Sequence, residues 1–131
     1  MVFSELKSLC EALLLGDSKV PDYPVLSHLA HQALMRCASE AEALALVTQS
    51  KDFTLLRIIN SDLYIRKPER PVNDIDKIDI DEELAFAVAN YTAASLSKKR
   101  PEFFKVEAMD IIANYNHKLL DARNELEAEN G

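Results

Sequence analysis

Residues 62–96, DLYIRKPERPVNDIDKIDIDEELAFAVANYTAASL, decide the fold because three kinds of local structure follow one another within them. Residues 62–67 are rich in branched and aromatic side chains, which is typical of a β-strand. Residues 68–80 contain two prolines and alternate aspartate with isoleucine, so they predict a loop. From residue 81 the chain becomes alanine-rich, with acidic residues at its start that favour a helix N-terminus.

A second extended segment precedes this stretch. Residues 53–59, FTLLRII, have the same branched and aromatic character, and Asn60 and Ser61 supply a turn. Together with residues 62–67 they predict a β-hairpin. Because a two-stranded hairpin is only marginally stable alone, we expect it to lean on the helices or to pair with another chain.

The N-terminal part of the chain is predicted to be helical. Apolar residues recur at three- and four-residue steps over residues 3–14, with Ser4 as the expected N-cap and Gly16 just past the end. Residues 17–24 contain two prolines and predict a loop. Residues 25–38 again show helical spacing, so the sequence predicts two helices before the hairpin.

Residues 39–48 support two different predictions. Ser39 and Glu42 have the spacing of a capping box, which predicts a break at Ser39 and a short new helix through Val47. The apolar run ALALVT, residues 43–48, instead fits a strand. Periodicity alone does not decide between these two readings, so both stay open.

The alanine-rich helix has clear signals at both ends. Asp79 or Asp81 is the expected N-cap, and acidic residues in the first turn oppose the helix dipole favourably. Basic residues 98–100 complement its negative end. Pro101 prevents continuation and suits the start of another helix, so the sequence predicts two separate helices in the last third of the chain.

The last predicted helix is long and covers residues 102–127. Apolar residues follow one another at steps of three and four, close to a heptad repeat, at Phe104, Ala108, Ile111, Tyr115, Leu119, Ala122 and Leu126. Residues 121–130 are polar apart from Leu126 and are expected to project from the body. That end is either a helix that docks on a partner or a frayed, solvated tail.

Composition limits the classes of protein that fit. The 131 residues are enough for one hydrophobic core, and the net charge of −7 argues against tight non-specific binding to nucleic acid. Cys10 and Cys37 lack metal or redox spacing and suit a reducing compartment. The sequence shows no leader and no membrane-length apolar run, so we expect a soluble protein made in the cytoplasm.

The predicted fold class is mainly α: a small helical bundle of four to five helices with an inserted β-hairpin. We expect one domain over residues 1–131, made of a helical N-terminal half (3–48), the hairpin with its loop (53–80) and C-terminal helices (81–128).

The residues that usually carry chemistry do not form a site in this sequence. His28 and His31 lie three apart without a third ligand at a suitable spacing, and zinc needs three or four. Counting from Asp74, the sixth and twelfth positions are Asp79 and Ala85, where a calcium-binding EF-hand loop needs glycine and glutamate. Phosphate-binding, nucleophile-elbow and Cys-x-x-Cys motifs are absent from the sequence. We therefore expect no catalytic residues, no cofactor and no metal.

A family resemblance rests on four segments in the second half of the chain: DLYIRKP (62–68), IDIDEEL (78–84), AFAVANYTAASLSKK (85–99) and EAMDIIANYN (107–116). The arrangement resembles the head–tail connector (adaptor) proteins of tailed bacteriophages and prophages. The resemblance implies two N-terminal helices, a hairpin and two further helices, with no catalytic residues. The N-terminal half matches the family only in its helical pattern.

The resemblance also implies a place in a virus particle. Such adaptors form a homo-oligomeric ring below the portal protein, extend the DNA channel and receive a stopper or tail protein. We therefore expect a virion protein of the neck region, made in the bacterial cytoplasm, past which DNA slides without sequence-specific binding. On this reading the hairpin, the loop and the last helix supply protein contacts, through Tyr64, Ile65, Arg66, Lys67, Arg70, Ile75, Ile78, Leu119 and Leu126.

Two alternative functions come from other classes. One is a small bacterial regulatory or adaptor protein that binds a partner helix along the near-heptad face of its last helix. The other is a metal-dependent or hydrolytic helical enzyme that uses the carboxylates of residues 74–81. Assembly limited to a dimer or a 1:1 complex would favour the first, and tight binding of a divalent ion would favour the second.

Overall fold

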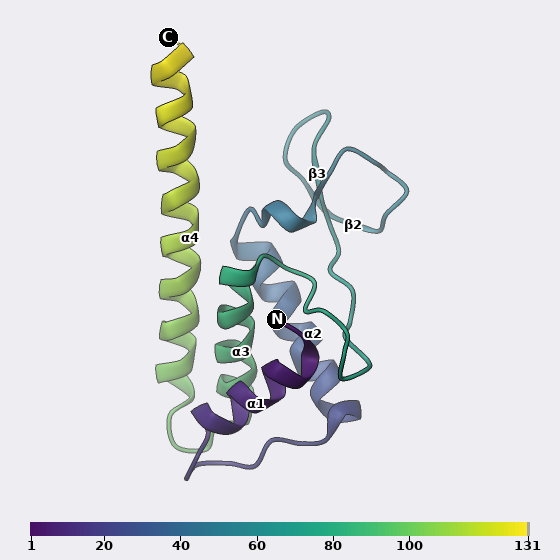
Figure 1. The fold of residues 1–131 in the computed structure, drawn as a ribbon, viewed down its shortest axis with the longest axis vertical. Coiled ribbons are helices and arrows are strands. Elements are labelled where there is room, and N and C mark those ends of the chain that lie inside the picture. The colour runs from purple at the N-terminus through teal and green to yellow at the C-terminus, as the bar shows by residue number, and fades with distance from the viewer. Residues whose placement is uncertain (131) are drawn as a thin grey trace.

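A computed structural model describes the backbone of residues 1–130 and the side chains of residues 1–128 (Figure 1). The elements follow the order predicted from the sequence, and the mainly α fold with a β-hairpin is confirmed. Their bounds are α1 (Phe3–Leu13), α2 (Tyr23–Glu40), the 3₁₀ turn η1 (Leu44–Leu46), β1 (Val47–Thr48), β2 (Leu55–Ile58), β3 (Tyr64–Arg66), α3 (Glu82–Leu96) and α4 (Pro101–Asn130).

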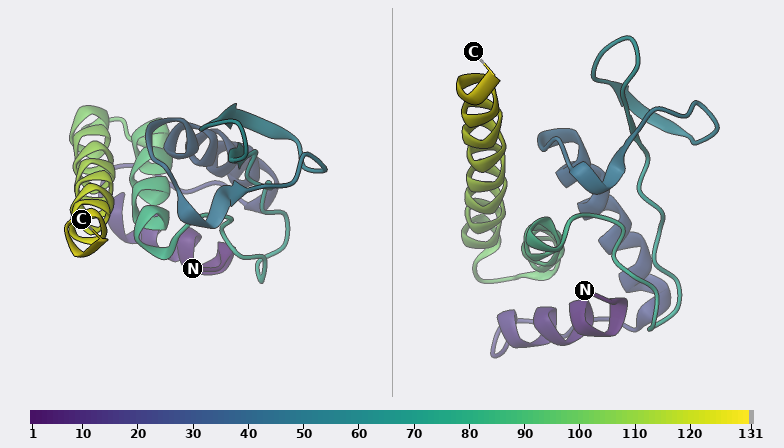
Figure 2. Two further views of the ribbon diagram at one scale, coloured as in Figure 1. Left: turned by 90° about the horizontal axis from the view of Figure 1, so that it is seen from above. Right: turned by 45° about the horizontal axis from the view of Figure 1, so that its top comes forward.

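The helix α3 lies at the centre of the bundle. It packs against α1, α2 and α4, and α4 forms the outer edge of the molecule (Figures 1 and 2). Alanines give α3 a thin cross-section, so three helices can approach it closely. Its buried residues lie on nearly all sides of the helix: Leu84, Ala85, Ala87, Val88, Ala89, Tyr91, Thr92, Ala93 and Ala94.

One main hydrophobic core connects all parts of the chain. Phe3 and Leu6 from α1, Leu34 from α2 and Leu84 from α3 are fully buried in it. The hairpin contributes Ile65, which is also fully buried. A smaller cluster around Leu14 and Phe104 closes the end where α3 turns into α4.

The predicted hairpin is part of a three-stranded antiparallel sheet. The strand order is β1-β3-β2, so β3 has a partner on both sides. Val47 pairs with Ile65 and Thr48 with Tyr64, while β2 pairs with the other edge of β3 through an irregularity after Leu55. The hairpin therefore receives a third strand from its own chain.

The segment after α2 corrects the prediction of a break at Ser39. The helix α2 continues to Glu40, and the Ser39 hydroxyl donates to the carbonyl of Met35, at 2.8 Å, instead of capping a new helix. A single 3₁₀ turn and then β1 follow. The strand prediction was therefore right only for Val47 and Thr48, and the predicted short helix is present only as the 3₁₀ turn Leu44–Leu46.

The start of α1 also differs from the prediction. The N-cap position belongs to Val2 and not to Ser4. The backbone N–H groups of Phe3 and Ser4 donate to the carbonyls of Asp76 and Asp74, at 2.8 and 2.9 Å. A helix start leaves backbone donors without partners, and here the loop before α3 satisfies two of them. Residues 72–78 are thereby tied to the N-terminal helix.

Candidate interaction surfaces

Three of the predicted contact residues belong to the core. Ile65 is fully buried, and Ile78 and Tyr64 are only 4% and 7% exposed. A partner cannot reach these side chains without opening the sheet or the loop, so we withdraw them as contact residues. The burial of Ile65 and Ile78 depends on packing in the main hydrophobic core against helices that are distant in the sequence, so a local pattern does not reveal it.

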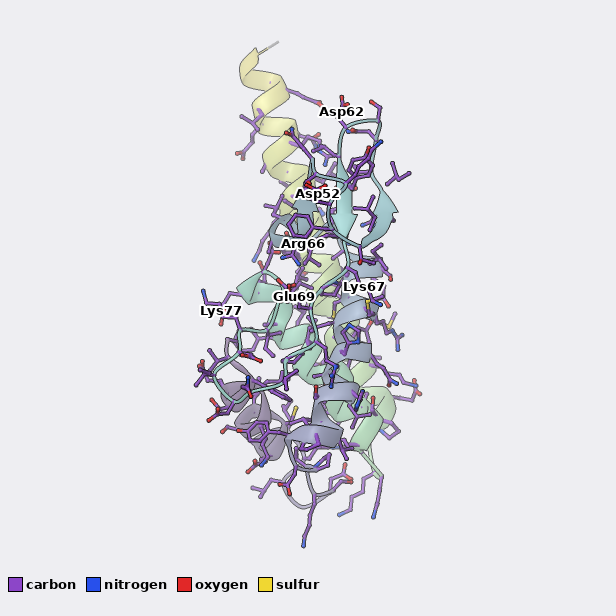
Figure 3. All side chains as sticks on the ribbon, turned by 90° about the vertical axis from the view of Figure 1, so that its right-hand side faces the viewer. Asp52, Asp62, Arg66, Lys67, Glu69 and Lys77 are labelled. Carbon is purple, nitrogen blue, oxygen red and sulfur yellow. The ribbon has the colours of Figure 1, made fainter. Side chains whose placement is uncertain are left out.

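The three predicted basic contact residues, Arg66, Lys67 and Arg70, differ in their surroundings: both arginines contact other residues of the chain, and the lysine is exposed. The Arg66 guanidinium binds both carboxylate oxygens of Asp79, at 2.6 and 2.7 Å (Figure 3 labels Arg66). Burial opposes ionisation of Asp79, but Arg66 and the N–H of Glu69 hold its pKa below the usual value. Arg70 donates to the Ser27 hydroxyl at 3.0 Å. Lys67 is exposed and can still contact a partner.

The remaining predicted contact residues differ in accessibility. Ile75 is 78% exposed in the loop that caps α1, and Leu126 is 59% exposed on the projecting part of α4. Leu119 is half-buried against the core. Ile75 and Leu126 therefore remain predicted contact residues, while Leu119 already serves the fold.

The near-heptad face of α4 is largely used inside the molecule. Phe104, Ala108 and Tyr115 are buried by α3 and its neighbours, together with Ile112, which lies beside that face. The alternative function of partner binding along this face therefore cannot involve residues 104–115. The near-heptad face is accessible to a partner only in the part of α4 beyond Leu119.

A second apolar face on α4 points away from the bundle. Val106, Met109, Ala113 and Leu120 are exposed, and the three larger side chains each keep about half of their surface in contact with solvent. We call these four residues the outer stripe. Their steps of three, four and seven match a second heptad repeat on the same helix.

An apolar pocket of about 550 Å³ lies between α1, α3 and α4. Leu9, Leu13, Phe86 and Ile111 supply its apolar walls, and Phe86 is 46% exposed. Lys118 and Glu83 form an ion pair of 2.8 Å at its rim.

The turn between α3 and α4 is held by a single carboxylate. Asp17 accepts hydrogen bonds from the Ser97 hydroxyl at 2.6 Å and from the backbone N–H groups of Lys98 and Lys99. The hydrogen bond from Ser97 is the main reason that the pKa of Asp17 falls to about 2. We call residues 98–100 the basic turn; their side chains are exposed at the start of α4.

The other end of α4 is acidic. Residues 121–128, the acidic tail, are exposed and include Asp121, Glu125 and Glu127. Arg123 forms an exposed ion pair with Glu42 at 3.3 Å. Figures 1 and 3 show the tail on the same end of the molecule as the hairpin, where Asp62 lies near the tip.

A polar network ties the segment after α2 to α3 and α4. The Tyr115 hydroxyl donates to Asp81 at 2.7 Å and accepts from the N–H of Leu44 at 3.0 Å. The other oxygen of Asp81 accepts from the N–H of Ala45, so Asp81 occupies the N-cap position of α3 without capping it through its side chain. Burial and the nearby carboxylate raise the pKa of Tyr115 to about 12.

The histidine, aspartate and cysteine residues considered as possible ligands are dispersed. No group of three His, Cys, Asp or Glu residues that would suit a metal ion occurs in the part of the chain that the structure describes. His31 lies 3.3 Å from the carbonyl of Pro68, and the Asp76 carboxylate accepts from the N–H groups of Val72 and Asn73. Both cysteines are buried, and burial raises the pKa of Cys10 to about 12.

Comparisons with known proteins yield no relative: no protein-family model, no curated protein and no solved structure matches the chain. Within residues 1–130, no helix combines the length and the apolar character needed to cross a membrane.

Proposed function

We propose that the protein is a non-enzymatic structural subunit of a phage head–tail connector, which forms a ring below the portal and extends the DNA channel. The proposal starts from the four segments that resemble this family. The observation that carries it in the structure is the difference between the two ends of the molecule.

One end presents the hairpin and the acidic tail, and the other presents the basic turn (Figure 1). The tail reaches beyond the packed part of α4, since side chains 120–128 are exposed. A connector subunit contacts a different protein at each end, portal on one side and stopper or tail on the other. Two chemically distinct ends suit that task better than a uniform surface does.

The charge of the chain supports the expected relation to DNA. A net charge of −7 repels phosphate, so a channel built from this chain would let DNA pass without adhering. In the proposed function the protein resides in the neck of the virion after synthesis in the host bacterium.

The test is mass spectrometry of phage particles purified from the host after induction or infection. We expect the chain at a fixed ratio to the portal protein, and particles with heads but without joined tails when its gene is deleted. Intact, infectious particles that lack the chain would refute the proposal. A variant that carries Glu125→Lys and Glu127→Lys should fold but join fewer tails or portals, with Glu107→Lys, outside the tail, as the matched control.

The outer stripe favours a second candidate, a small bacterial adaptor that binds a partner helix on α4. Half-exposed Val106 and Met109 on one face of a helix are the kind of surface that receives an amphipathic helix. A defined 1:1 complex with a cellular protein, lost on Met109→Asp, would support this function. Capture of phage structural proteins alone would exclude it.

A further inference from the structure

We propose that two copies of the free chain pair through the outer stripes of their α4 helices, which run antiparallel about a two-fold axis near Ala113. The inference goes beyond the proposed function because it concerns the chain outside any ring. It stands on the geometry and charge of α4, whichever of the two candidate functions is correct.

The outer stripe has the pattern of a helix–helix contact. Val106, Met109, Ala113 and Leu120 lie on one face of α4 at heptad spacing, opposite the face that α3 covers. Large apolar residues that are half exposed and aligned over about 20 Å of helix are unusual on a monomer's surface. Figure 2 shows α4 at the outer edge of the bundle, with no other helix or strand of residues 1–130 on its outer side.

The position of the two-fold axis follows from side-chain size. If Ala113 faces Ala113 of the second copy, Val106 faces Leu120 of that copy, and the reverse contact repeats by symmetry. The small residue at the centre lets the two helices approach closely, and the larger residues fill the space on both sides. In the same register Asp110 lies beside His117 of the second copy.

The charges at the ends of α4 select the antiparallel direction. The basic turn lies at the helix N-terminus and Glu127 lies near its C-terminus, so both repel the charge of the helix dipole there. An antiparallel partner brings its Glu127 next to the basic turn, and this happens twice by symmetry. A parallel pair would instead place basic turn against basic turn and acidic tail against acidic tail.

The size of the contact predicts its strength. In this register residues 101–125 of the two helices overlap over about 38 Å, and a face about 10 Å wide buries roughly 750 Å² over both partners. That area lies in the range of weak, reversible complexes. The pair should therefore be a dimer whose population rises with concentration, and it should dissociate when a stronger partner competes for α4.

The first experiment is analytical ultracentrifugation of the purified full-length chain up to about 1 mM. We expect a concentration-dependent dimer that Met109→Asp abolishes, with Ile75→Asp as the control because Ile75 is exposed on a different surface. Circular dichroism should show that both variants fold. A monomer at all concentrations, or a dimer that Met109→Asp leaves intact, would overturn the inference.

Cysteine cross-linking tests the register. Ala113→Cys should form an intermolecular disulfide on mild oxidation, because the two thiols meet at the two-fold axis. Asn114→Cys is equally exposed but points about 100° away around the helix, so it should cross-link far more slowly. The native cysteines are buried and do not compete. Equal rates for the two variants would contradict the proposed axis.

A charge exchange tests the direction. Lys98→Glu and Glu127→Lys should each weaken the dimer up to about tenfold, since each change affects two exposed charge contacts. The double variant should recover most of the loss, because it restores opposite charges across the interface. If the double variant is as weak as the sum of the two single variants, the antiparallel arrangement is wrong. Particle mass spectrometry remains the separate test of the proposed function, so the failure of either claim is distinguishable.

Discussion

The helices α3 and α4 pack along one another but use their apolar residues in opposite ways. Nine of the 15 residues of α3 are buried, on nearly all sides, because α1, α2 and α4 surround it. The helix α4 buries one face against α3 and leaves the outer stripe in solvent. Apolar content alone therefore does not determine burial; the number of neighbouring elements does.

The largest difference in stability should come from replacing one leucine by alanine in α3 and, separately, one in α4. Leu84→Ala removes a fully buried side chain from α3 and should cost about 2–5 kcal/mol of unfolding free energy. Leu120→Ala removes the same atoms from the exposed stripe and should change the monomer's stability by less than about 0.5 kcal/mol.

Urea unfolding of both variants at low micromolar concentration measures the difference. Similar losses at the two positions would mean that the outer stripe is packed in the monomer, and the comparison between α3 and α4 would fail.

The next effect concerns the polar contact between the two helices. Tyr115→Phe removes the hydroxyl that donates to Asp81 and accepts from the N–H of Leu44. The N–H of Leu44 then loses its acceptor in a partly buried place, so we expect a loss of about 1–3 kcal/mol. Tyr23→Phe, at the half-buried start of α2, keeps the ring that packs on Phe3, so it is the control and should cost little. Hydrogen exchange at residues 44–46 should rise only in the Tyr115 variant.

Asp17, which holds the turn between α3 and α4, should make the stability of the fold decrease at low pH. The pKa of Asp17 is about 2 in the folded chain and 3.8 as a reference for the unfolded chain. Between these values the unfolded chain binds more protons, so the contribution of Asp17 is complete above pH 3.8 and is lost as the pH falls toward 2.

Thermal unfolding of Asp17→Asn between pH 6 and pH 2 tests this contribution. The variant should be less stable than the natural chain at pH 6 and should approach it near pH 2. Asp52→Asn, in an exposed loop, should show no such convergence. A constant difference across the range would show that Asp17 acts through shape and not through its charge.

The smallest effect should come from the acidic tail. Ending the chain after Leu120 removes exposed side chains and the solvent-exposed ion pair of Arg123 with Glu42, which together should cost no more than about 1 kcal/mol. Ending it after Asn114 also removes Tyr115 and should prevent stable folding. Circular dichroism and urea titration distinguish the two. A large loss of unfolding free energy when the chain ends after Leu120 would show that the acidic tail packs against the rest of the molecule.

Much of the architecture could be predicted from local signals. Prolines at residues 68 and 71 separate the hairpin from α3, Pro101 begins α4, and Gly16 adopts the positive φ of 78° that a turn after α1 needs. The break at Ser39 could not be predicted correctly. The end of α2 is set by distant groups, since Tyr91 donates to Glu40 at 2.7 Å and Asn116 donates to its carbonyl.

The contact residues were predicted less well than the fold. Ile65 and Ile78 resemble surface residues of a hairpin and a loop in the sequence, but both belong to the main hydrophobic core. The heptad steps of Val106, Met109, Ala113 and Leu120 are visible in the sequence. They were not predicted as contact residues because a helix with two apolar faces does not reveal which one its own bundle uses.

Local signals specify the order and type of the main elements, because periodicity, prolines and helix-end residues act over a few positions. Which apolar residues remain exposed depends on how the elements pack. That choice depends on contacts between segments far apart in the chain, such as the loop carbonyls of Asp74 and Asp76 at the start of α1, or Asp17 at the turn before α4. A short pattern cannot encode such contacts, since burial is a property of the whole packed chain.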